Sequence, residues 1–114
     1  MIVAVNVVGG TVGEGLGRAQ TMVVATVEEG EITSWKSHDV RWDQCHGNFS
    51  AAGHGTHHAR IVSFMKEHEV EIVVTGHAGP PMAQTLGQMD ILMFQGATGD
   101  AREAALEAVQ TTTG

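Results

Sequence analysis

The sequence predicts a single α/β domain in which a mixed five-stranded sheet is covered by helices. Three observations support this fold class: the chain opens with an apolar run, two strand-like runs follow it, and helical patterns then alternate with short apolar runs. A chain of 114 residues is long enough for one core but too short for two independent ones. The expected element order is β-β-β-α-β-α-β-α.

The first part of the chain is expected to form three meandering strands. Met1 to Val8 are almost wholly apolar and rich in β-branched residues, as in a strand buried on both faces at the centre of a sheet. A glycine-rich loop follows. Thr21 to Glu28 and Glu31 to Asp39 are strand-like, and Glu29-Gly30 between them is typical of a tight hairpin turn.

The middle of the chain is expected to contain a long loop and the first helix. Val40 to Gly55 shows no periodicity and contains several glycines, and loops of this length are often functional. Thr56 can cap a helix that runs to about His68, because the apolar residues that follow have helical spacing. Glu71 to Thr75 is then expected to be a short buried strand.

Two further helices and one strand are expected in the last part. Gly76 to Pro81 is predicted to be a loop that ends with proline in the first turn of the second helix. Ile91 to Phe94 is the last strand, and Asp100 with Glu103 resembles a capping box for a helix from Ala101 to Val109. This order suits a ribonuclease-H-like arrangement.

The charge and the cysteine content exclude several function classes. Six Lys and Arg against thirteen Asp and Glu give a formal net charge of -7, which repels nucleic acids and anionic membranes. No run is long enough to span a membrane, and the first residues do not resemble a signal peptide. The only cysteine, Cys45, cannot form an internal disulfide, so we expect a cytoplasmic protein.

Candidate metal ligands concentrate in one short segment of the chain. Thiolate and imidazole groups bind zinc, iron and copper, and such ions need three or four donors. If the helix begins near Thr56, the histidines at its start can converge on one side. The alternative is a polar surface loop whose histidines act as caps and hydrogen-bond partners. The candidate ligands are Cys45, His46, His54, His57 and His58.

Three other histidines lie outside this segment. His77 follows the fourth strand, at the sheet edge where α/β proteins bind ligands, and it could complete the metal site. Hydrogen bonding to a neighbouring loop carbonyl is an equal alternative for His77. His38 and His68 are expected to be surface residues at the ends of elements.

Two motifs resemble a known family: Gly15-Leu16-Gly17-Arg18-Ala19 after the first strand, and Val73 to Gly79 at the fourth strand, followed by Ala83, Leu86 and Ile91. With them the chain resembles the dinitrogenase iron-molybdenum cofactor-binding family over nearly its whole length. That family includes small carriers of nitrogenase cofactor precursors, a terminal domain of a cofactor-assembly enzyme and stand-alone proteins. The resemblance implies a cofactor site at Gly15, Gly17, Arg18, Gly76 and Gly79.

One departure from the family pattern concerns the first glycine-rich loop. Many members carry a histidine there, whereas this chain has Gly15. The Cys/His segment is a local elaboration of this chain. The glycines are expected to allow close backbone approach, either to a ligand or between the two loops.

Three functions are therefore considered. The first is a carrier, store or sensor of an iron-sulfur or molybdenum-type cluster or of a single transition metal, with donor and recipient proteins as partners. The second is a zinc- or iron-dependent hydrolase that uses the same histidines. The third is an interaction module that responds to pH or metal.

Helix N-termini near His57, His58 and Gly79 are expected to present unpaired N–H groups and to favour an anionic species.

Overall fold

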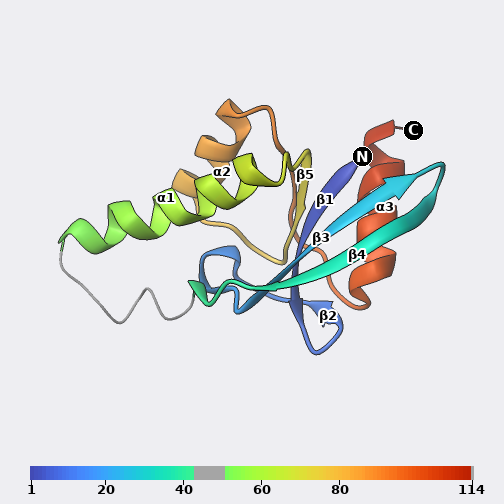
Figure 1. Cartoon of the computed structure of the whole chain (residues 1–114), viewed down its shortest axis with the longest axis horizontal. Helices are drawn as coiled ribbons and strands as arrows, with labels where there is room; N and C mark the ends of the chain where they lie inside the picture. Colours follow the sequence, from blue (N-terminus) through green and yellow to red (C-terminus); the bar gives the residue numbers. More distant parts are fainter. Residues whose placement is uncertain (43–50, 114) are drawn as a thin grey trace.

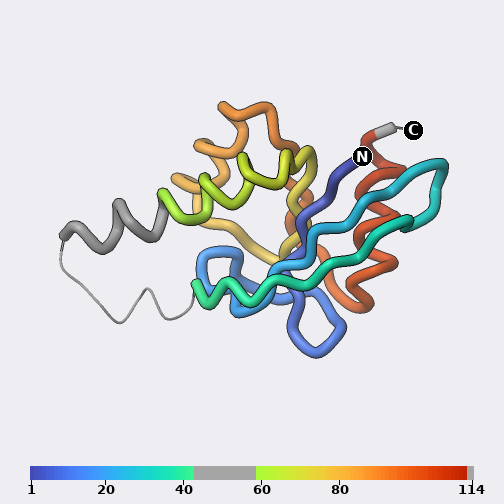
Figure 2. Tube along the Cα trace, viewed as in Figure 1, coloured from blue at the N-terminus to red at the C-terminus, as the bar shows by residue number. Residues whose placement is uncertain are grey.

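The computed structural model of the chain describes the backbone of residues 1–42 and 51–113, and side chains for 1–42 and 59–112 (Figures 1 and 2). Strands dominate the first part of the chain, and helices alternate with strands from residue 51 onward. The elements are β1 (Ile2–Val8), β2 (Thr11–Val12), the short 3-10 helix η1 (Leu16–Arg18), β3 (Thr21–Glu28), β4 (Glu31–Asp39), α1 (Ala51–Glu67), β5 (Ile72–Val74), α2 (Pro80–Gln88), β6 (Leu92–Phe94) and α3 (Ala101–Thr113).

The sheet is mixed, with the strand order β4-β3-β1-β5-β6 and the short β2 paired to β1. β3 and β4 run antiparallel as a hairpin, while β5 and β6 run parallel to β1. The α/β class is confirmed, and so is the expected order, in which meandering strands come first and helices then alternate with parallel strands. The ribonuclease-H-like arrangement stays a prediction.

The predicted count of five strands was wrong, because β2 adds a sixth. Gly9 and Gly10 take φ values of 59° and 86°, which turn the chain back so that Val7 pairs with Val12. Two residues are too few to show a β period, so the sequence pattern could not reveal this strand.

The first helix also differs from the prediction, because it begins at Ala51 and not near Thr56. Alanine is the strongest helix former, and an isolated glycine weakens a helix without always ending it. The last part of the predicted loop is therefore helical, and His57 and His58 lie beyond the first turn of α1. The argument that they sit at the positive end of a helix dipole is accordingly wrong.

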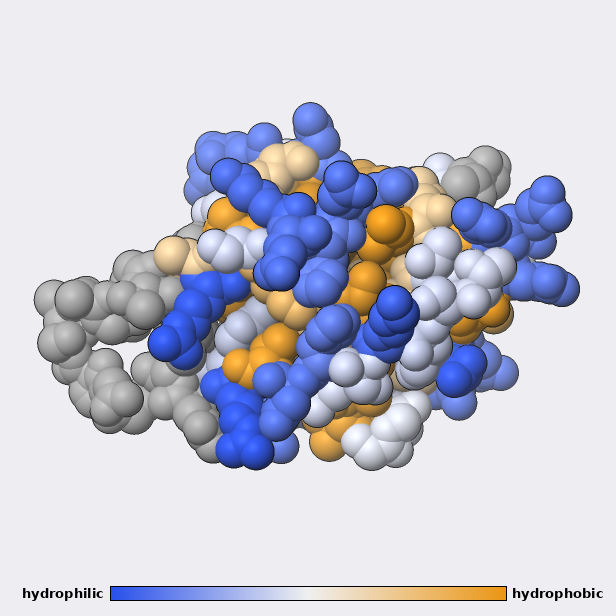
Figure 3. All heavy atoms as spheres, in the orientation of Figure 1, coloured by the Kyte–Doolittle hydropathy of each residue, from blue (hydrophilic) through white to orange (hydrophobic). Residues whose placement is uncertain are grey.

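Helices cover both faces of the sheet (Figure 1). On one face, α3 packs its small side chains against Val3 and Val5 of β1. On the other face, Ile61 and Met65 of α1 and residues of α2 surround Ala4. β1 is thus buried on both faces, as its composition predicted. Figure 3 shows hydrophilic side chains over much of one face of the molecule, with apolar patches between them.

Two local predictions are confirmed by backbone geometry. Glu29 and Gly30 both have positive φ, at 51° and 78°, as the tight turn between β3 and β4 requires. Asp100 Oδ1 accepts hydrogen bonds from the backbone N–H of Arg102 at 2.9 Å and of Glu103 at 3.0 Å, which caps α3. Among the helices of the described residues, none is long and apolar enough to cross a membrane.

Candidate functional site: two loops at the switch point of the sheet

The parallel neighbours β1 and β5 mark a switch point in the sheet. From β1 the chain continues to β3 on one side, whereas β5 leads through α2 to β6 on the other side. Ligands of open α/β sheets bind outside the carboxyl ends of strands at such a point. Two loops meet there, residues 9–20 after β1 and residues 75–79 after β5.

Backbone hydrogen bonds join these two loops. The N–H of Gly76 donates to the carbonyl of Gly13 at 2.9 Å, and the N–H of Leu16 donates to the carbonyl of His77 at 2.9 Å. Gly15 and His77 form an isolated parallel bridge between them. The structure therefore brings Gly15, Gly76 and His77 together through the backbone, and close approach between the loops was one of the two alternatives considered for the glycines.

Glycine is needed for this approach at two positions. A Cβ atom on Gly13 would lie 2.6 Å from Oδ1 of Asn6, and one on Gly76 would lie 3.0 Å from Cα of Glu14. At Gly13 and Gly76 the missing side chain thus permits loop-to-loop packing. A Cβ on Gly15 would meet nothing within 4 Å, so the space beside Gly15 is open.

A buried polar pair, which the sequence analysis overlooked, holds the loops in place. Nδ2 of Asn6 donates to the carbonyl of Gly15 at 3.0 Å and to Oγ1 of Thr75 at 3.2 Å. Both side chains are fully or almost fully buried. The sequence does contain a signal for this buried pair, because Asn6 is the one polar residue in the apolar run Met1 to Val8. Buried polar groups are normally paired, yet Oδ1 of Asn6 finds no partner among the described residues.

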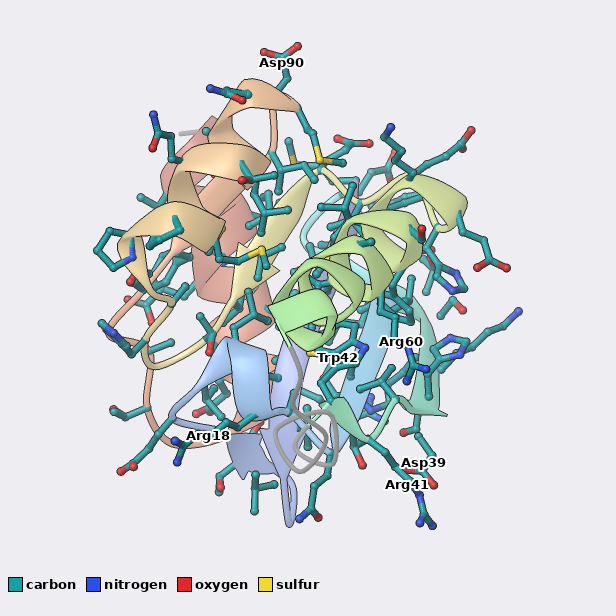
Figure 4. The ribbon with its side chains drawn as sticks, turned by 90° about the vertical axis from the view of Figure 1, so that its left-hand side faces the viewer. Arg18, Asp39, Arg41, Trp42, Arg60 and Asp90 are labelled. Atoms are coloured by element: carbon teal, nitrogen blue, oxygen red, sulfur yellow. The ribbon has the colours of Figure 1, made fainter. Side chains whose placement is uncertain are left out.

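A hollow of about 500 Å³ lies inside the first loop. Gly15 and Arg18, both predicted cofactor-binding residues, line this hollow. Asn6 and Glu14 line it as well. Figure 4 places Arg18 on this loop, to the left of Trp42 and Arg60 in that view. One cationic and one anionic residue are thus part of the lining, which suits a polar ligand that carries charge. Its lining residues are Asn6, Val8, Thr11, Val12, Gly13, Glu14, Gly15, Arg18, Ala19 and Gln20.

The second loop offers fewer donors than expected. The side chain of His77 is exposed, while Gly79 is the N-cap residue of α2. Pro80 and Pro81 occupy the first two positions of α2, and proline has no N–H. This helix end therefore presents fewer unpaired N–H groups than a helix start without proline.

The predicted Cys/His cluster is not tested by the geometry. Cys45 and His46 lie outside the described residues, and so do the side chains of His54, His57 and His58 in α1. Within the side chains that the structure describes, no group of three or more His, Cys, Asp or Glu residues could hold a metal ion.

A family model described as dinitrogenase iron-molybdenum cofactor matches residues 1–112. The chain belongs to this dinitrogenase iron-molybdenum cofactor family. Membership supports binding of a metal cluster in general terms. No curated protein sequence matches the chain.

Solved structures share the fold of this family member. The crystal structure of PH0822 aligns with a TM-score of 0.74 at 18% identity, over 97% of this chain and 90% of that one. A putative dinitrogenase from Methanocaldococcus jannaschii aligns with a TM-score of 0.65 at 13% identity, over 98% of this chain and 89% of that one. The apo form of the orange protein from Desulfovibrio gigas aligns with a TM-score of 0.66 at 21% identity, over 98% of this chain and 86% of that one. At these identities the likeness shows the fold alone.

The structure corrects one further expectation for this family member. His38 and His68 were expected on the surface, but both are partly buried and their rings contact each other and Phe64. No sequence pattern signals this contact, because His38 lies in β4 and His68 in the turn that follows α1.

Proposed function

We propose that this protein binds and carries a metal-sulfur cluster, of the iron-sulfur or iron-molybdenum-cofactor type, at the hollow beside Gly15. Family membership over residues 1–112 supports a cluster as the cargo. The observation that carries the location is the open space next to Gly15, in a hollow of about 500 Å³ at the switch point of the sheet.

The residues around the hollow suit an anionic cargo. Metal-sulfide clusters are commonly anionic, and the guanidinium of Arg18 supplies positive charge in the lining. The open space beside Gly15 leaves room for a bulky group, and Gly17, Gly76 and Gly79 are proposed to complete the two loops around it. Glu14 opposes an anion, so the cargo is expected to seat nearer to Arg18 than to Glu14.

Direct ligands for the metal are proposed from the Cys/His segment. Cys45, His46, His54, His57 and His58 supply thiolate and imidazole groups, and the exposed His77 adds an imidazole on the second loop. A carrier implies a donor and a recipient protein. We expect it to act in the cytoplasm, where the thiol of Cys45 stays reduced.

The proposal is tested by anaerobic titration of the apo protein. Thiomolybdate and reconstituted iron-sulfide species are added in parallel with simple zinc and iron salts, and calorimetry and visible absorption follow the binding. Tight uptake of the sulfide-containing species supports the carrier. Uptake of colourless zinc alone would instead favour the zinc-dependent hydrolase, and no uptake of any metal would favour the interaction module.

Variants locate the site. Gly15→Leu fills the open space and is expected to weaken cluster uptake, whereas Gly87→Leu in α2, where a Cβ also meets nothing within 4 Å, serves as the matched control. Cys45→Ser and His57→Ala are expected to lower the amount of bound metal without unfolding the domain. If both retain full metal content, the assigned ligands are wrong.

A further inference from the structure

A cluster of four aromatic rings joins the end of β4 to α1. The ring centroids of His38 and His68 lie 4.7 Å apart, with the ring planes at 52°. Phe64 packs against both histidines, at 5.5 Å from His38 and 4.5 Å from His68, and Trp42 meets Phe64 edge-on at 5.4 Å. Two imidazoles from different elements are thus held side by side.

The backbone on both sides of this cluster is anchored. His38 pairs with the buried Met22 of β3, and the N–H of Trp42 donates to the carbonyl of Ala19 at 2.8 Å. At the end of α1, the N–H of His68 donates to the carbonyl of Phe64 at 3.1 Å. These backbone contacts hold the two imidazoles beside each other, and donors whose positions are fixed in advance bind an ion more tightly.

Burial and the neighbouring charges favour the neutral form of His38. Burial lowers the pKa of His38 below the usual 6.5, and the neighbouring His68 and Lys36 lower it further, while Glu67 opposes them.

A groove of about 480 Å³ runs along α1 beside this cluster, and both histidines are themselves partly exposed to solvent. Trp42, Phe64 and Glu67 line the groove, and Figure 4 shows Trp42 and Arg60 beside the near end of the helix. Because the described side chains include no group of three metal-binding residues, an ion held here would keep water in its remaining coordination positions.

We propose that His38 and His68 form a two-histidine site for one divalent transition metal ion of the class that prefers imidazole nitrogen, such as Zn²⁺. Imidazole is among the preferred ligands of zinc, copper and nickel. An ion bound here would link β4 to the end of α1. The site shares no residue with the proposed cluster site, so either proposal can fail alone.

The test uses Zn²⁺ and the full chain, with nuclear magnetic resonance of the histidine ring protons as the readout. The resonances of His38 and His68 are expected to shift together, along one binding curve. Following assigned rings separates this site from zinc bound by histidines elsewhere in the chain. If neither resonance moves at saturating Zn²⁺, or if they respond only to pH, the proposal is wrong.

Variants give a second, independent measurement. His38→Gln and His68→Gln keep a polar side chain of similar size, and each is expected to weaken Zn²⁺ binding at the remaining ring by about tenfold or more. Lys36→Gln removes a positive charge near His38 and is expected to tighten binding, while Ser63→Ala in the groove serves as the control. Unchanged affinity in both histidine variants would overturn the site. Circular dichroism verifies that each variant is folded, and the wild-type resonances decide the question if a variant is not.

Discussion

Replacing Gly13 with alanine tests the packing of the two loops at the candidate site. The new Cβ would lie 2.6 Å from Oδ1, 2.9 Å from Cγ and 3.0 Å from Nδ2 of Asn6. Asn6 cannot turn aside without cost, because its Nδ2 donates to the carbonyl of Gly15 and to Oγ1 of Thr75 in a buried environment. Either the loop or the amide must move.

The expected cost follows from these two contributions. Overpacking a tight site costs about 1–3 kcal/mol, and a buried polar group that loses its partner costs about 1–3 kcal/mol. Because moving the loop and breaking the hydrogen bonds are partly alternative responses, we expect Gly13→Ala to lower the free energy of unfolding by about 2–4 kcal/mol. Urea unfolding followed by circular dichroism measures the change.

Gly15→Ala is the matched control in the same loop. Its Cβ would meet nothing within 4 Å, and the φ of Gly15 is -117°, which alanine adopts readily. By restricting the unfolded chain, this substitution is expected to be neutral or to stabilise the fold by about 0.4–1 kcal/mol. Equal effects of the two substitutions, or a Gly13→Ala protein as stable as wild type, would refute the reasoning.

A double-mutant cycle identifies the atoms responsible. Asn6→Ala alone leaves Thr75 and the Gly15 carbonyl without their donor, yet it also makes room for a Cβ at position 13. The Asn6→Ala/Gly13→Ala protein should therefore lose less stability than the sum of the single losses, by about 0.5–3 kcal/mol. Strict additivity would show that the clash with Asn6 is not the cause.

Three further predictions concern other parts of the fold. Burial and neighbouring charges lower the pKa of His38 in the folded protein, so on acidification the unfolded chain binds this proton before the folded protein does. The free energy of unfolding should therefore fall as the pH drops below 6.5. His38→Gln should flatten that part of the pH profile, as measured by urea titrations at several pH values. Asp100→Ala removes the cap of α3 and should cost about 0.5–2 kcal/mol, and Asp100→Asn clearly less, by chemical denaturation. The guanidinium of Arg102 lies 4.6 Å from the ring centroid of Trp35, so Arg102→Gln should lower stability by about 0.5–1 kcal/mol, an effect that should disappear in a Trp35→Leu background.

Local patterns in the sequence were sufficient for much of the fold. The apolar run Met1 to Val8 predicted a central strand, and Glu29-Gly30 predicted the hairpin turn between two strand-like runs. Asp100 predicted the start of the third helix. Each of these features depends on residues that are close along the chain, so periodicity and turn chemistry suffice to find them.

The candidate site was predicted only in part. The glycines were expected to allow close approach either to a ligand or between the two loops, and the loops do meet at Gly15 and His77. The sequence could not show that Gly13 and Gly76 serve loop packing while Gly15 leaves open space. That distinction depends on which atoms face each glycine, and those atoms come from distant parts of the chain.

The sequence by itself determined the α/β class, the family and the set of residues available for metal chemistry. Tertiary structure alone decided that Asn6 meets Thr75 across two parallel strands, 69 positions apart in the chain, and that His38 meets His68. Such contacts arise from sheet register and from the way a helix packs on a strand. They leave no periodic signal in the sequence, because each partner is selected by burial against the other and not by its neighbours along the chain.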